Sequence, residues 1–203
     1  MDSAEPIEEL RVEARACKAC PLWRHATQTV FGDGDACAPL MLVGEQPGNE
    51  EDENGLPFVG PAGALLDRAL TDAGLARASV YVTNAVKHFK WEPRGKRRIH
   101  KTPTQKEIDA CQRWLMAEIE AVNPACIVCL GATAGRAVLG HAVRIGALRG
   151  VAQVHPAWPQ RRVVLTYHPA FVLRQRDTDR MAVAYGELVA DLADAARLLL
   201  TVR

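Results

Sequence analysis

The chain has 203 residues, 48% of them apolar, which is enough for one domain with a complete hydrophobic core. Its formal net charge of +1 gives no overall field that attracts nucleic acid, so any such binding must rely on local basic patches. No stretch has the composition of a membrane span or a secretory signal, so we expect a cytoplasmic protein whose six cysteines serve as free thiols or metal ligands rather than disulfides.

The first half of the chain alternates predicted strands and helices. An apolar strand over 39–44 runs into a turn rich in glycine and proline, and a helix follows over 61–74, with Pro61 at its start and Gly74 at its end. A second strand covers 80–86. A second helix covers 104–122, and Thr104 and Glu107 form a capping box at its start.

The second half continues this alternation and indicates the fold class. We predict strands over 126–131 and 161–166, a segment at 151–155 beside the latter, a short helix over 132–139 and a closing helix over 179–200. Continuous apolar strands separated by helices indicate an α/β fold, a three-layer αβα sandwich with a short, mainly parallel central sheet. We expect a single domain over 1–203, in which residues 1 to about 38 resemble this core least.

The segment 95–101, with the sequence GKRRIHK, is the most informative part of the chain. It lies between a predicted strand and a predicted helix, so we expect a loop at the edge of the sheet where α/β folds gather their chemistry. Its four cations can hold a phosphate backbone, and the neutral imidazole of His100 can act as a nucleophile. The alternative is an ordinary solvated basic loop.

Three polar side chains also fall at the ends of predicted strands. Gln46 follows the first strand, Asn84 ends the second and His168 follows the last, so all three are expected at the carboxyl edge of one sheet. The turn after the first strand is not a phosphate-binding P-loop, because the terminal Gly-Lys-Ser/Thr is missing. Taken singly, each of these residues is more often structural than functional.

Taken together, the motifs resemble a known family. GEQPG at 44–48, LPFVGPAG at 56–63, VTN at 82–84 and HP at 168–169 look like the ordered motifs of the iron–sulfur, family 4 uracil-DNA glycosylases. The segment KRRIHKTP at 96–103 narrows the resemblance to the UdgX subgroup, and the match runs from about residue 17 to 173. The resemblance implies the sandwich fold predicted above and activity on uracil-containing DNA. We expect single-stranded DNA to be the preferred substrate, and a monomer, because nothing in the sequence indicates an obligate dimer.

The chemistry of base excision and the resemblance assign the same roles to the residues at the strand ends. Breaking the glycosidic bond places negative charge on uracil, after the base has been flipped out of the stack. We expect a ring to stack on the flipped base, an amide to read its polar edge, and a histidine and backbone N–H groups to bind its oxygen. The expected uracil-binding residues are Gly44, Gln46, Gly48, Phe58, Asn84 and His168.

The expected catalytic residues are His100, Gln46, Glu45 and His168. Resemblance to the UdgX subgroup implies that His100 captures C1′ of the deoxyribose and leaves the protein covalently trapped on the abasic site. Neighbouring cations should lower the pKa of His100 and favour its neutral form, and Gln46 or Glu45 should orient the ring. The alternatives are a multi-turnover glycosylase that uses water, and a non-catalytic iron–sulfur protein that binds nucleic acid.

The cysteines suggest a metal site near the N-terminus. Cys17 and Cys20 form a CxxC pair, which by itself fits a zinc or redox site as well. Family 4 proteins supply two further cysteines, and here Cys111 takes one position while His88 stands at the other. We therefore expect a [4Fe–4S] cluster held by Cys17, Cys20, His88 and Cys111, tying residues 1 to about 38 to the core. The rival ligands Cys126 and Cys129 lie in an apolar strand, where free cysteines pack as small hydrophobes.

DNA phosphates are the expected partners of the basic residues around the site. The residues given this role are Lys87, Lys90, Lys96, Arg97, Arg98, Lys101, Arg174 and Arg176. Leu173 either fills the gap left by the flipped base or is a core leucine at the entry to a helix.

Overall fold

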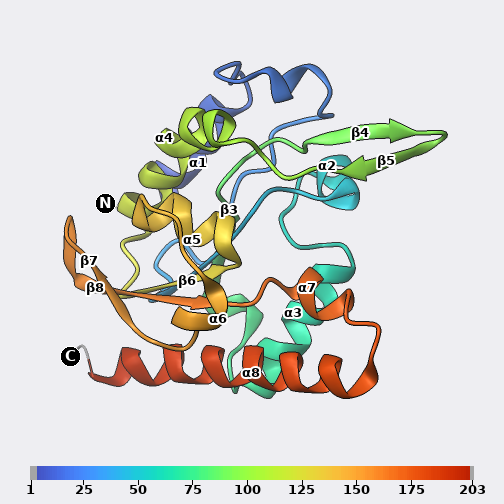
Figure 1. The fold of residues 1–203 in the computed structure, drawn as a ribbon. Helices are drawn as coiled ribbons and strands as arrows, with labels where there is room; N and C mark the ends of the chain where they lie inside the picture. The colour runs from blue at the N-terminus through green and yellow to red at the C-terminus, as the bar shows by residue number, and fades with distance from the viewer. Residues whose placement is uncertain (1–3, 202–203) are drawn as a thin grey trace.

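The computed structural model describes residues 4–201 and consists of a sheet between two layers of helices (Figure 1). The six strands lie in the order β1-β3-β2-β6-β8-β7. The parallel central strands are β3 (Val80–Asn84), β2 (Leu40–Gly44), β6 (Cys126–Leu130) and β8 (Trp158–Thr166). The edge strands β1 (Asp33–Gly34) and β7 (Gln153–His155) are antiparallel to their neighbours. The predicted three-layer α/β architecture is therefore confirmed.

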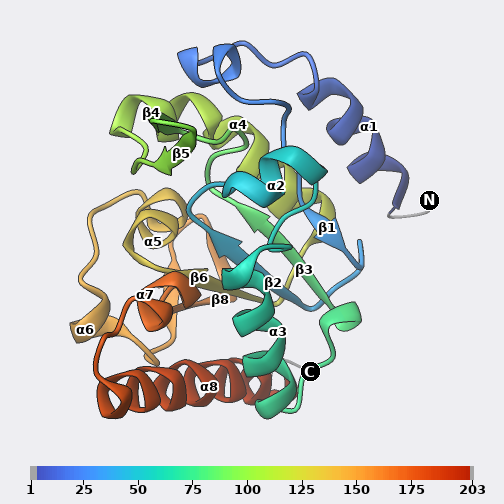
Figure 2. The ribbon, with the colours of Figure 1, turned by 90° about the vertical axis from the view of Figure 1, so that its right-hand side faces the viewer.

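Strands β2, β3 and β6 are buried along their whole length and β8 is buried from Val163 to Thr166, which explains the largely apolar sequence of these segments. Met41 and Ile127 face the layer formed by α1 (Ala4–Ala14), α4 (Gln105–Val122) and α5 (Ala132–Leu139). Leu42 and Val128 face α3 (Pro61–Asp72) and α8 (Thr178–Thr201), which cover the opposite side (Figure 2). The sheet thus separates two apolar cores.

The remaining helices within residues 4–201 are short. They are the 3-10 helices Pro21–Arg24 and Arg77–Ser79 and the helices α2 (Asn49–Asn54), α6 (Ile145–Leu148) and α7 (Pro169–Leu173). The capping box predicted for α4 is present, with the Glu107 carboxylate accepting the Thr104 N–H at 2.6 Å. Within residues 4–201, no helix combines the length and the apolar character needed to cross a bilayer.

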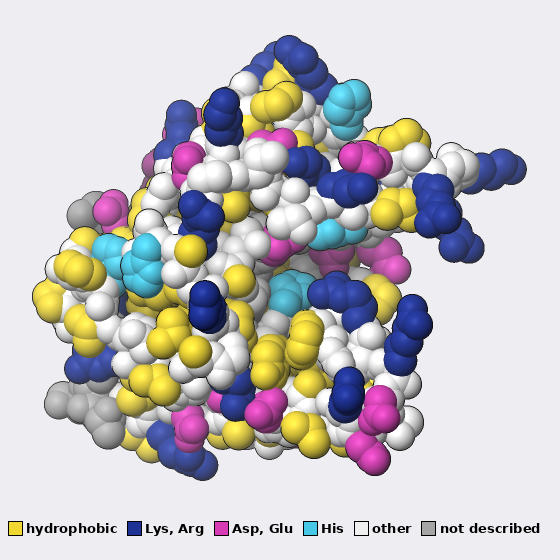
Figure 3. All heavy atoms as spheres, in the orientation of Figure 1, with side chains coloured by type: hydrophobic (Ala, Val, Ile, Leu, Met, Phe, Trp, Pro, Cys, Tyr) yellow, Lys and Arg dark blue, Asp and Glu magenta, His cyan; other side chains and the backbone are white. Residues whose placement is uncertain are grey.

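The basic segment is a β-hairpin and not the loop expected from the sequence. Strand β4 (Trp91–Arg94) pairs antiparallel with β5 (Arg97–His100), so that Trp91 lies opposite His100. Gly95 opens the two-residue turn with a φ of 62°, which glycine adopts without steric cost. The hairpin projects from the body, and its basic tip is visible in Figure 3. Because β5 ends at His100, this residue lies at the base of the hairpin, within 3.6 Å of Glu45, which directly follows β2.

Candidate active site

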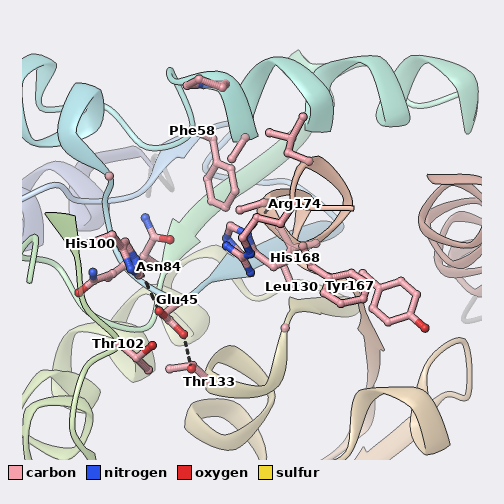
Figure 4. A pocket seen from close by; sticks show the side chains of 18 of the residues that line it. Glu45, Phe58, Asn84, His100, Thr102, Leu130, Thr133, Tyr167, His168 and Arg174 are labelled. Atoms are coloured by element: carbon pink, nitrogen blue, oxygen red, sulfur yellow. Dashed lines mark hydrogen bonds and ion pairs between the residues drawn. The ribbon is translucent and has the colours of Figure 1, made fainter. Parts of the chain in front are cut away.

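A cavity of about 1020 Å³ opens at the carboxyl edge of the sheet (Figure 4). The next strand in the chain, β3, pairs with one edge of β2, whereas the later strands β6 and β8 lie on the opposite side of β2. The strand order therefore reverses at β2, and the cavity lies at this switch point. Most of the residues predicted for catalysis and uracil binding line this one space. These are Glu45, Gln46, Gly48, Phe58, Asn84, His100 and His168, together with Arg174.

Asn84 and Phe58 form a narrow cradle in the cavity. Asn84 is only 2% exposed, and its Oδ1 has no hydrogen-bond partner within the described residues, so this acceptor is free to bind a ligand. Phe58 holds a φ of 57°, an uncommon backbone conformation for this residue and typical of functional sites. A Cβ on Gly44 would stand 2.6 Å from the Phe58 ring and closer still to Asn84 Oδ1. Glycine at position 44 therefore keeps the cradle open.

His168 presents a hydrogen-bond donor to the cavity. Its Nδ1 accepts the Ala170 N–H at 3.1 Å and caps α7, so the proton of the neutral ring resides on Nε2. Burial lowers the pKa of His168 to about 4, with Arg174 and His100 adding to the effect. The ring lies 5.8 Å from that of Phe58, centroid to centroid. A flat ligand in the cradle would meet a neutral N–H donor.

His100 lies across the cavity from His168, beside a carboxylate. Its Nε2 is 3.6 Å from Glu45 Oε1, and the Thr133 hydroxyl donates to the other oxygen of Glu45 (Figure 4). Burial is the largest cause of a lowered pKa for His100, Glu45 opposes the shift and Arg174 supports it. The expected direction is confirmed, but the cation responsible is Arg174 and not the basic neighbours of His100 along the chain. The side chain is still 48% exposed, which leaves it accessible to a large substrate.

Comparison with known proteins identifies the family. Residues 31–193 match the model of the uracil DNA glycosylase superfamily. The chain belongs to this superfamily. It is 40% identical to a type-4 uracil-DNA glycosylase of Thermotoga maritima over 187 residues, covering 91% of this chain and 92% of the relative. Type-4 uracil-DNA glycosylases of Pyrobaculum aerophilum and Archaeoglobus fulgidus are each 35% identical, with coverage of 92% and 91%, and of 83% and 84%.

In this superfamily member the Gln46 side chain lines the cavity and also supports the base of the hairpin. Its amide nitrogen donates to the carbonyls of Lys90 and Lys101 at 3.2 and 3.1 Å, and its oxygen accepts the Lys90 N–H at 3.1 Å. Both ends of the amide are therefore used at the base of the hairpin, one residue from His100. The N–H of Gly48 donates to Glu51 at 2.9 Å as part of the capping box of α2, so this donor is already engaged within the protein.

Arg98 fastens the hairpin to α2. Its guanidinium contacts Asp52 at 2.6 Å, Glu53 at 2.9 Å and the Asn49 side chain at 2.6 Å. Lys101 pairs with Glu92 at 2.8 Å, and Lys90 pairs with Glu107 at 2.9 Å. Carboxylates therefore already engage several of the cations that were expected at phosphates.

Lys87 was expected to contact a DNA phosphate, but its position in the structure excludes this. It is buried and paired with Glu118, so its predicted contact with phosphate is wrong. Lys96 and Arg97 remain exposed at the tip of the hairpin, and Arg174 is exposed at the cavity. Leu173 is 43% exposed and lines the cavity, so it is not the core leucine of the alternative interpretation.

Three of the four predicted cluster ligands gather between the N-terminal segment and α4. Burial is the largest cause of the raised pKa of Cys111. The nearby thiols of Cys20 and Cys17 raise this pKa further. The Sγ of Cys17 accepts the indole N–H of Trp114, and that of Cys111 accepts the Lys87 N–H, both at 3.2 Å. Within residues 4–201, no three His, Cys, Asp or Glu side chains are close enough to hold a single metal ion. Ligands of a cluster stand farther apart than those of one ion, and N–H donors to sulfur suit such a group.

The surroundings of the other ligand candidates, His88, Cys126 and Cys129, differ. His88 is buried, which lowers its pKa and keeps the imidazole neutral as a ligand requires. Cys126 and Cys129 are buried in the two apolar cores, so the packing interpretation of these residues is confirmed. The sequence analysis missed Thr133, which comes soon after β6 and supports Glu45. Its position after a parallel strand was the available signal.

Proposed function

We propose that this protein is a uracil-DNA glycosylase that releases uracil from DNA and remains bonded to the abasic sugar through His100. The observation that carries the proposal is that the cradle of Asn84 and Phe58 and the accessible imidazole of His100, whose lowered pKa favours the neutral form, line one cavity. The similarity to type-4 uracil-DNA glycosylases supports the substrate. The covalent step rests on the position of His100 and on the basic segment that resembles the UdgX subgroup.

Uracil recognition follows from the cradle. The unpartnered Asn84 Oδ1 suits the imino N–H of uracil, and the amide NH₂ of the same side chain suits an adjacent uracil oxygen. Cytosine presents an acceptor where uracil has its imino N–H, so the same amide would disfavour it. Phe58 stacks on the base, and the Nε2–H of His168 donates to a uracil oxygen as negative charge develops.

The covalent step requires one bond to break and one to form. The bond between C1′ and uracil N1 breaks, and its electron pair leaves with uracil, which takes a proton from water. A ring nitrogen of His100 donates its lone pair to C1′, and the Glu45 carboxylate stabilises the positive charge gained by the ring. Thr133 holds Glu45 in place for this role. An alkylated imidazole is a poor leaving group, so the complex persists.

The hydrolytic alternative is favoured by one observation, the 3.6 Å separation of His100 and Glu45 at an exposed cavity mouth where water has access. The stoichiometry of uracil release decides between the two. Protein is mixed with a fivefold excess of labelled single-stranded DNA containing one uracil, and the products are run on a denaturing gel. We expect at most one uracil per protein and a slow band that contains both protein and DNA. Uracil in excess of protein without that band selects hydrolysis, and binding without release selects a non-catalytic protein.

The pH dependence of adduct formation should report the protonation of His100. Only the neutral ring has a free lone pair, and the pKa of His100 is lowered from the ordinary 6.5, so the neutral form persists into mild acid. We expect single-turnover rates that stay constant down to about pH 6.5 and then fall tenfold per pH unit at still lower pH. A decline that already begins above neutral pH would rule out His100 as the titrating nucleophile.

Replacing Gly44 with alanine should close the cradle. The new Cβ would stand 2.6 Å from the Phe58 ring and also crowd Asn84, so uracil could not enter without displacing one of them. We expect uracil release to fall by about 100-fold or more. Gly186→Ala is the matched control, because a Cβ at this position in α8 meets no atom within 4 Å. Equal activity of the two variants would show that the cradle does not hold the base.

We also propose that Cys17, Cys20, His88 and Cys111 hold a [4Fe–4S] cluster. The effect of Cys17 and Cys20 on the pKa of Cys111 and the two N–H donors to sulfur support this assignment. The role of the cluster is structural: it would tie residues 1 to about 38 to α4 within one domain.

Anaerobic purification followed by iron analysis and the brown absorbance tests the cluster. Cys111→Ser should lose iron, whereas Cys37→Ser, an exposed site, should retain it. A colourless protein that contains zinc would reject the cluster. The preference for single-stranded DNA, the monomeric state and the cytoplasmic location stay predictions.

A further inference from the structure

The cavity is larger than the uracil cradle requires. At about 1020 Å³ it lies at the upper limit of ordinary ligand pockets, roughly 300–1,000 Å³, and one pyrimidine base fills only part of it. The remaining space extends from His168 toward α6 and α7, along Ile145, Tyr167 and Phe171. No residue of this region has a role in the proposed excision of uracil.

An aromatic pair forms part of the wall of this extension. The rings of Tyr167 and Phe171 are stacked, with centroids 4.7 Å apart and planes inclined by 24°. Phe171 is nevertheless 38% exposed, which is unusual for a phenylalanine. Because Tyr167 covers one face of the Phe171 ring, a ligand ring that stacks on Phe171 must use the opposite face.

Arg149 fixes the Tyr167 ring in place. The Arg149 guanidinium lies 5.5 Å from the centroid of the Tyr167 ring, and it is itself fixed by ion pairs to Asp191 at 3.0 Å and Glu187 at 3.1 Å. Burial is the main cause of the raised pKa of Tyr167, and Glu187 is the next. A ring held in this way loses little freedom when a ligand stacks on its partner, which favours binding.

The pair is continuous with the proposed uracil site. His168 lies between Tyr167 and Phe171 in the chain, and Arg174 follows Phe171 within one turn and lines the same cavity. A strand that delivers its uracil to the cradle must place the next nucleotide at the cavity mouth, with a phosphate between the two. Arg174 supplies a cation for that phosphate, and Phe171 an aromatic face for the base.

We propose that Phe171, backed by Tyr167, is a stacking subsite for the unpaired base next to the excised uracil. This inference rests on the proposed function and extends it to a second nucleotide. Stacking tolerates any base, because every base has a π-face. It requires a base free of a duplex partner, so the subsite also accounts for the expected preference for single-stranded DNA.

Substrates that lack one neighbouring base test the subsite. Uracil release under single-turnover conditions is measured with single-stranded DNA in which an abasic spacer replaces the nucleotide on the 5′ or the 3′ side of uracil. We expect the wild type to lose at least fivefold in efficiency with the spacer on one side only. Phe171→Leu, which keeps an apolar side chain without a ring, should be slow on intact DNA and show no further loss with that spacer.

The control is Val183→Ala, an exposed position on α8 outside the residues that line the cavity. It should behave as wild type, and unfolding temperatures should be unchanged for both variants. A wild type that tolerates both spacers, or a Phe171→Leu protein that retains the full spacer penalty, overturns the subsite while leaving the glycosylase proposal intact. Absence of uracil release from intact DNA would instead contradict the proposed function.

Discussion

Replacing His100 with alanine should abolish the covalent adduct and allow repeated turnover. The substitution removes the imidazole that faces the cavity beside Glu45 and leaves a space large enough for water. Phe58, Asn84 and His168 are untouched, so binding and release of uracil should continue. We expect the slow band on a denaturing gel to fall by at least about 100-fold, the scale on which catalytic groups act, while uracil release rises above one per protein.

The control for this variant is His141→Ala, because His141 is exposed and does not line the cavity. The Glu45→Gln change in the His100→Ala background separates the role of the carboxylate, since a water held beside Glu45 needs a base. Turnover should fall in that double variant. An undiminished adduct in His100→Ala would assign the bond to another nucleophile, which mass spectrometry of the attached peptide would identify.

The sheet and the placement of Asn84 and His168 at its carboxyl edge could be predicted from the sequence because both depend on local rules, whereas Phe58 was expected from the chemistry of base excision and the family resemblance. Strands such as 126–131 are apolar at each position, as expected for a sheet covered on two faces, and residues at the ends of parallel strands meet at one edge. The hairpin escaped prediction because it has no buried face. Glu92, Arg94 and Arg97 are exposed, so no alternation marks the strands, and Pro93 argues against one.

The supporting contacts of the site were missed for a different reason. Gln46 lies at a strand end like Asn84, yet its amide is used by the backbone of the hairpin, whose path the sequence does not reveal. Arg98 and Arg97 both belong to the basic segment, but their surroundings differ. The carboxylates of α2 pair with Arg98, whereas Arg97 is exposed at the tip of the hairpin. Residue type and position in the chain therefore identify candidate site residues. Tertiary contacts determine whether such a residue is available to bind a ligand or instead supports the structure around the site.

The ion pair of Lys87 and Glu118 was also missed, although the sequence contained a signal for it. Glu118 lies three residues after Leu115 and seven after Cys111, so helical spacing places it on the same buried face of α4 as these two residues. A carboxylate there requires partners. It accepts the Gly32 N–H at 2.9 Å and the hydroxyls of Tyr81 and Thr83 at 3.0 and 2.9 Å, in addition to pairing with Lys87. Burial and Glu118 raise the pKa of Tyr81, which keeps that hydroxyl a neutral donor.

Replacing Glu118 with leucine should therefore be among the most destabilising changes in the protein. Lys87 is 1% exposed and Glu118 is fully buried, so the variant leaves an ammonium group in the core without its counter-charge. The free energy of unfolding should fall by about 3–5 kcal/mol, which for a domain of this size lowers the unfolding temperature by roughly 6–20 °C. Glu120→Leu, at an exposed position of the same helix, should change the free energy by no more than about 0.5 kcal/mol.

The double variant Lys87→Met/Glu118→Leu separates charge from packing and links this network to the cradle. With both charges removed, most of the lost stability should return, because the penalty of the single variant comes from the unpaired lysine. Uracil release should stay several-fold below wild type, since the Lys87 ammonium also donates to the Asn84 carbonyl at 2.7 Å and fixes the backbone that carries the reading amide. If the double variant unfolds as easily as Glu118→Leu, lost packing and lost hydroxyl contacts are the cause. If it is stable and fully active, the ion pair holds the core together without positioning Asn84.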